Sequence, residues 1–106
     1  MNTSNAMVIR GLVVEEEVQL TLMELCQACS AEKEHVLSWV FEGVLEPVGE
    51  SPQHWRFGGD SLRRARQARR LACDLDINPP GVALALDLLD EISALRARLQ
   101  RARARG

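Results

Sequence analysis

The last quarter of the sequence forms one segment without a helix-breaking residue. Pro79-Pro80-Gly81 marks its start, since proline is tolerated in the first turn of a helix, and no further proline or glycine occurs before Gly106. We expect a helix from residue 80 to about residue 105, roughly 37 Å long at 1.5 Å per residue. Apolar residues recur in it at alternating spacings of three and four, the heptad pattern of a coiled coil, at Ala85, Leu88, Ile92, Leu95 and Leu99.

A helix of this length cannot bury its distal half within so small a chain. The sequence has 106 residues, 46% of them apolar and 26% charged, which is the composition of one globular domain. We therefore expect the heptad seam, formed by the five residues just named, to pair with the same helix of a second copy. Residues 80–106 are then a dimerisation helix, and the protein is a homodimer.

Composition also excludes several classes of protein. No apolar run approaches the roughly 20 residues of a membrane span, and a secretory signal is not expected at the N-terminus. Three cysteines are an odd number at low density, which argues against a disulfide scaffold and favours the cytoplasm. No nucleophilic triad, carboxylate pair or phosphate-binding glycine loop is visible, so we do not expect an enzyme or a cofactor.

The cysteines form one recognisable motif. Cys26 and Cys29 are spaced as in a CxxC pair, but a structural zinc site needs four ligands. Cys73, His35 and His54 are too scattered along the chain to complete one. We expect buried thiols, with Cys73 near the core side of its helix, and no metal.

Residues 7–79 carry the signals of a separate domain, after residues 1–6, which we expect to be a tag remnant. Residues 8–14 and 18–20 have the composition of short strands. A capping box at Thr21 and Glu24 predicts a helix over residues 22–28. Ser30 is a suitable N-cap for a second helix, over residues 31–42, which Gly43 ends. The apolar stripe of this second helix is Val36, Leu37, Val40 and Phe41.

The rest of this domain combines a turn, an extended piece and a third helix. The proline- and glycine-containing residues 47–52, followed by the extended residues 54–57, predict a small β-wing. Gly58-Gly59-Asp60 precedes a helix over residues 61–75. Its apolar positions are Leu62, Ala65, Ala68, Leu71, Ala72 and Leu75.

This order of elements resembles a winged helix-turn-helix protein of the MerR type. The turn at residues 41–47 (FEGVLEP) is similar to that of the family, in which an acidic residue and glycine precede two apolar residues and proline. A closer resemblance is to the CbpM family of bacterial chaperone modulators. It rests on the Trp-x-Phe of the wing (Trp55 and Phe57), on the junction LDINPPG at residues 75–81, and on VALALDLLDEI at residues 82–92.

The resemblance implies a mainly α fold: a MerR-like winged helix-turn-helix with a small β-wing and a long C-terminal dimerisation helix. It also implies a partner, the J-domain of the DnaJ-like co-chaperone CbpA. A modulator of this kind blocks the engagement of that J-domain with the Hsp70 chaperone DnaK.

Charge distribution indicates where such a partner would bind. Residues 1–62 carry three basic and ten acidic residues, a net charge of −7, whereas residues 63–106 carry ten arginines and five acidic residues, a net charge of +5. J-domains, as a family, present a basic helix to the Hsp70 chaperone, and an acidic surface would compete for it. The candidate partner-binding residues, around the second helix, are Glu34, Trp39, Glu42 and Glu46.

The alternative is a MerR-like DNA-binding transcriptional regulator. DNA binding needs cations on the recognition surface, but the position of the family's recognition arginine is occupied by Leu37, and those of its tyrosines by Ser38 and Trp39. We therefore expect weak or absent DNA binding. A regulator would have to use the arginines of the third helix, which we expect instead to pair with the acidic first half of the same molecule.

Overall fold

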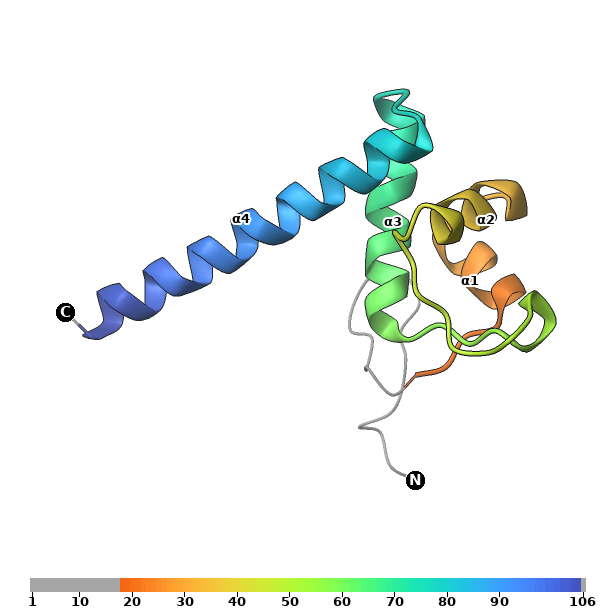
Figure 1. Cartoon of the computed structure of the whole chain (residues 1–106), viewed down its shortest axis with the longest axis horizontal. Helices are drawn as coiled ribbons and strands as arrows, with labels where there is room; N and C mark the ends of the chain where they lie inside the picture. The colour runs from red at the N-terminus through yellow and green to blue at the C-terminus, as the bar shows by residue number, and fades with distance from the viewer. Residues whose placement is uncertain (1–17, 106) are drawn as a thin grey trace.

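The computed structural model describes residues 18–105, and most of them are helical (Figure 1). In chain order the elements are α1 (Leu22–Cys29), α2 (Lys33–Phe41), the 3-10 turn η2 (Pro52–His54), α3 (Gly59–Asp74) and α4 (Pro79–Arg105). α1 and α2 lie on one side of α3, and α4 extends away from the opposite side of α3 (Figure 1). The predicted mainly helical fold is confirmed. The expected tag remnant at residues 1–6 and strand at residues 8–14 lie outside the described residues.

The capping box at the start of α1 is present as predicted. The Glu24 amide donates to the Thr21 hydroxyl oxygen at 3.1 Å, and the Thr21 amide donates to the Glu24 carboxylate at 2.9 Å. The prediction that Ser30 begins the next helix is wrong. Ser30 instead ends α1 in the left-handed conformation, with φ 57°, and the Ala31 amide donates back to the Cys26 carbonyl at 3.0 Å. This satisfies carbonyls that the last turn of α1 leaves without partners.

α2 is shorter than expected, since Ser30 and Ala31 take part in the turn that ends α1. It begins at Lys33 after Glu32, whose side chain makes no capping hydrogen bond. At its other end Gly43 adopts φ 80°, a conformation that glycine takes without steric cost. The turn is closed by a 2.8 Å hydrogen bond from the Val44 amide to the Trp39 carbonyl.

The segment between α2 and α3 contains two isolated antiparallel bridges rather than continuous strands. Val48 pairs with Arg56, and Leu20 pairs with Phe57. The Leu20 and Phe57 backbones exchange two hydrogen bonds of 2.8 and 2.7 Å. The expected β-wing remains a prediction, since within residues 18–105 the pairing does not extend beyond these bridges.

One apolar core joins all four helices to the loop that precedes α3. Trp39 and Phe57 are its largest members, and α4 contributes only its first turns, through Val82 and Leu86. Two predicted inward positions at the end of α3 are wrong, because Leu75 and Cys73 are exposed. No helix within residues 18–105 is both long enough and apolar enough to cross a membrane.

Candidate functional site

The face of α2 that points away from the core carries a short, mixed stripe. Glu34, Ser38 and Phe41 are spaced by four and three residues, which places them one above another on a helix. Glu34 and Phe41 are exposed and Ser38 is half-buried, whereas Val36 and Trp39 on the opposite face are buried. Glu42 follows Phe41 as the C-cap of α2. Lys33, at the first position of α2, is also exposed and is the one lysine or arginine of this helix. The surface at the recognition-helix position is thus apolar with an excess of acidic residues.

The predicted orientation of two aromatic residues on α2 is reversed in the structure. Trp39 was a candidate surface anchor, but its side chain is only 1% exposed, so this prediction is wrong. Its indole packs in the core and stacks on the His35 ring at a centroid distance of 6.1 Å. Phe41, expected in the core, is 87% exposed.

Glu46 lies in an acidic depression between the turn after α2 and helices α3 and α4. The depression has a volume of about 470 Å³, and four carboxylates line it against a single guanidinium, that of Arg64. The carboxylates belong to Glu46, Asp60, Asp87 and Asp90. Of these four, only Glu46 was predicted as a site residue. Asp60 was counted in the acidic half but lies at the start of α3, and Asp87 and Asp90 belong to the half with a net positive charge.

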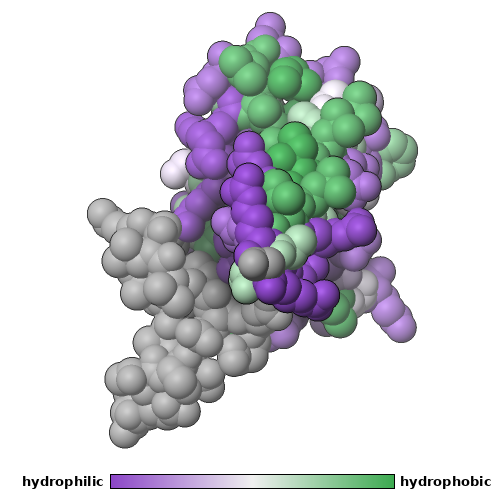
Figure 2. Space-filling model, turned by 90° about the vertical axis from the view of Figure 1, so that its left-hand side faces the viewer, coloured by the Kyte–Doolittle hydropathy of each residue, from purple (hydrophilic) through white to green (hydrophobic). Residues whose placement is uncertain are grey.

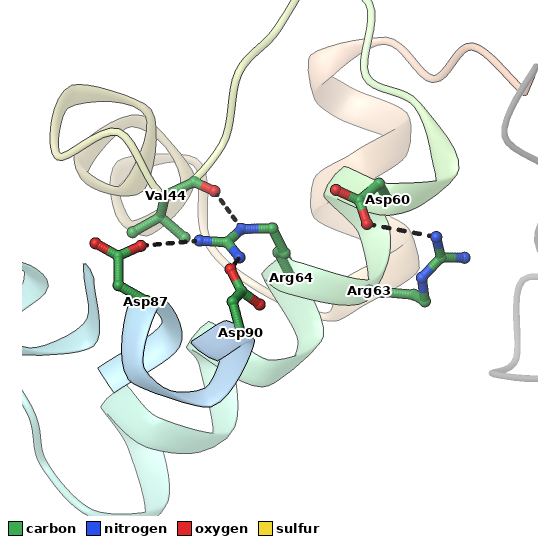
Figure 3. A network of polar contacts seen from close by, with 6 residues as sticks. All are labelled: Val44, Asp60, Arg63, Arg64, Asp87 and Asp90. Atoms are coloured by element: carbon green, nitrogen blue, oxygen red, sulfur yellow. Dashed lines mark hydrogen bonds and ion pairs between the residues drawn. The ribbon is translucent and has the colours of Figure 1, made fainter. Parts of the chain in front are cut away.

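Arg64 fixes the start of α4 against the rest of the domain (Figure 3). Its Nε donates to the Val44 carbonyl at 2.8 Å, and its terminal nitrogens pair with Asp90 at 2.5 Å and Asp87 at 3.9 Å. The Arg64 side chain is 18% exposed, whereas the Asp87 and Asp90 side chains are 76% and 60% exposed. The guanidinium is therefore held in place by the fold, while water still screens both ion pairs. One side chain therefore links α3, α4 and the turn after α2.

The described contacts of the α3 arginines agree with expectation only in part. Arg69 donates to the Ser30 carbonyl at 2.7 Å, which ties α3 to the turn between α1 and α2. Arg63 pairs with Asp60 within its own helix at 3.4 Å (Figure 3). The expected pairing with carboxylates of the first half is thus found for Arg63, since Asp60 belongs to residues 1–62. It is wrong for Arg64, whose partners Asp87 and Asp90 belong to α4.

The CxxC cysteines have the environment of structural thiols. Cys29 is buried and Cys26 half-buried, and burial raises the pKa of both thiols above their ordinary value. For Cys29 the neighbouring Cys26 adds to the rise. Thiols with raised pKa values stay protonated at neutral pH and are poor nucleophiles and metal ligands. Among residues 18–105 there is also no cluster of three side chains suited to hold a metal ion.

The heptad seam of α4 is exposed along most of its length. Leu88, Ile92, Leu95 and Leu99 are between 43% and 56% exposed, and only Ala85 is half-buried. Figure 2 looks at the molecule from the side toward which α4 projects, and hydrophobic side chains gather there beside a band of hydrophilic ones. An apolar strip of this length on one helix is typical of a contact surface.

Comparison with known proteins agrees with this fold. Residues 20–104 match the model of a family described as MerR HTH family regulatory proteins. A relative from Coxiella burnetii, named chaperone modulatory protein CbpM, is 41% identical over 93 residues, which cover 88% of each chain. A protein of the same name from Pseudomonas putida is 39% identical over 80 residues, covering 76% of this chain and 79% of the relative.

Proposed function

Because the chain belongs to the CbpM family of chaperone modulatory proteins within the MerR-like helix-turn-helix proteins, we propose that it inhibits a DnaJ-like co-chaperone. In this proposal it binds the J-domain of CbpA in the cytoplasm and prevents that J-domain from engaging DnaK. The names of the family and of the relatives describe regulators and modulators, not catalysts. The inhibition is accordingly stoichiometric and requires no cofactor.

The observation that carries the proposal is the charge of the surface around α2. Glu34 and Glu42 lie on or beside its outward stripe, and the acidic depression around Glu46 follows in the next turn. A basic J-domain helix is attracted to such a surface, which speeds the encounter and selects the partner. The phosphates of DNA are repelled by the same carboxylates.

We also propose that the protein acts as a homodimer joined through the heptad seam. Burial of the exposed leucines and of Ile92 against a second copy would supply the apolar contact that the distal part of α4 does not make within its own chain. A two-fold arrangement would leave both α2 surfaces available to partners.

Reversal of charge at the α2 surface tests the partner and its position. In the variant with Glu42→Lys and Glu46→Lys, we expect the affinity for the CbpA J-domain to fall about tenfold, mainly through slower association, because electrostatic steering is lost. Wild-type binding should weaken with added salt more than binding by the variant, since surface charges are screened. Titration calorimetry at two salt concentrations measures both effects, and J-domain-stimulated ATP hydrolysis by DnaK measures inhibition.

The matched control carries the same change in charge at positions away from α2. Glu50→Lys with Asp74→Lys alters two exposed carboxylates that neither lie on α2 nor line the acidic depression. This control should bind and inhibit like the wild type. Equal weakening by both double variants would mean that net charge, rather than this surface, determines binding, and unchanged binding by both would move the docking site elsewhere.

DNA binding separates this proposal from a regulator of transcription. At physiological salt we expect affinities in the micromolar range or weaker for any duplex, without preference for sequence, as in non-specific binding. Fluorescence anisotropy with a panel of operator-like palindromes is a suitable measurement. A nanomolar complex with one palindrome would favour the transcriptional alternative.

A further inference from the structure

Phe41 is the most exposed large apolar side chain among residues 18–105, at 87%. The sequence has only four aromatic residues, and the other three, Trp39, Trp55 and Phe57, belong to the core or pack against it. Exposure of a single apolar residue is common on protein surfaces. Here, however, the residue lies next to Glu42 and on the same stripe as Glu34, and burial in the core does not account for its position. Lys33 is the one lysine or arginine of α2.

The neighbours of Phe41 define what it can contact. Glu34 lies two helical turns before it on the same stripe, about 10 Å along the helix axis, and Glu42 is adjacent. An aromatic ring flanked by carboxylates over two turns matches a helix that carries lysines or arginines on either side of an apolar position. The aliphatic stems of those cations can cover the ring while their charged ends reach the carboxylates.

We infer that Phe41 is the apolar anchor of the docking surface and that its partner is a basic amphipathic helix. This inference rests on the proposed function, because it takes the α2 surface as the place where the J-domain binds. Carboxylates at the edge of an interface set the rate of association, whereas an aromatic residue desolvated at its centre sets the rate of dissociation. Phe41 and the glutamates should therefore affect different rate constants.

The test compares Phe41→Ala with Leu75→Ala in the full chain. Leu75 is also exposed, at 64%, but it lies beyond the end of α3 and away from the α2 surface. Its replacement by alanine therefore also removes exposed apolar surface, but outside the docking surface. We expect Phe41→Ala to raise the Kd for the CbpA J-domain at least 30-fold, as at an interface hot spot. The increase should come from faster dissociation, with an unchanged salt dependence. Phe41→Trp should restore most of the affinity. Leu75→Ala should bind like the wild type.

The possible failures are distinguishable. A wild-type protein that does not bind the J-domain would refute the proposed function itself. If the wild type binds and Phe41→Ala binds equally well, the proposed function stands and the anchor is wrong. If Phe41→Ala loses binding but sedimentation shows that its dimer has dissociated, the contact is with a second copy, and the anchor is again wrong. Thermal denaturation should give the same midpoint for Phe41→Ala and the wild type, since the ring lies outside the core.

Discussion

Replacement of Ile92 by aspartate should convert a dimer into monomers. Ile92 occupies the middle of the heptad seam and is 43% exposed in the single chain, so a second copy would bury it. A carboxylate at this position would enter an apolar interface without a cation or hydrogen-bond donor to compensate, and each dimer would contain two of them. Sedimentation velocity at micromolar concentration measures the change directly, and Leu95→Asp should have the same effect.

The control introduces the same charge on another face of the helix. Gln100 is exposed and lies outside the seam, so Gln100→Asp should leave the dimer intact. Circular dichroism should show that both variants keep the helices of the folded domain, because the first turns of α4 are held to α2 and α3 by Val82, Leu86 and the Arg64 contacts. Any loss of helix in the monomeric Ile92→Asp variant should be confined to the distal part of α4. An intact Ile92→Asp dimer would exclude the seam as the contact. Dissociation by Gln100→Asp as well would indicate a different or wider interface.

The elements that sequence analysis predicted well are those with local signals. The capping box at Thr21 fixes the start of α1, Gly43 fixes the end of α2, and the absence of a breaker after Gly81 defines α4. Each of these depends on interactions within a few residues, which do not require knowledge of the tertiary structure. The order of these caps, turns and helices also indicated the resemblance to MerR-like proteins.

The orientation of α2 was not predictable in this way. Apolar residues occupy more than half of its circumference, since Val36, Leu37, Trp39, Val40 and Phe41 are all apolar. The pattern therefore fits two helix orientations, one burying Leu37 and Phe41 and the other burying Trp39. Only packing against the other helices and the loop before α3 decides between them, and it selects Trp39. The wrong predictions for the burial of Trp39 and Phe41 follow from this ambiguity.

The electrostatics of the site also depend on tertiary contacts. The net charge of residues 1–62 predicted the sign of the α2 surface. Asp87 and Asp90, however, were counted in residues 63–106, which have a net positive charge. The fold brings both to Arg64, beside Glu46, and they extend the acidic surface onto α4. Net charges of segments predict the character of a surface only when the segment forms that surface alone.

Truncation of Trp39 should destabilise the monomer more than any change at the α2 surface. The indole is 1% exposed and contributes to the core shared by the helices, so Trp39→Ala leaves a cavity where an aromatic side chain was packed. Substitutions of this kind typically cost about 3–5 kcal/mol, a large part of the roughly 5–15 kcal/mol that stabilises a small domain. Urea denaturation followed by circular dichroism, at a fixed protein concentration because dimerisation adds to stability, measures the loss.

Two controls assign this loss to the core rather than to the ring stack or the exposed surface. His35 is exposed and touches Trp39 only through stacking at 6.1 Å, so His35→Ala should change the free energy of unfolding by no more than about 0.5 kcal/mol. Phe41→Ala should change it equally little. If Phe41→Ala is instead as destabilising as Trp39→Ala, the ring of Phe41 is buried in solution. The outward orientation of Phe41 on α2, and with it the anchor at Phe41, would then be wrong.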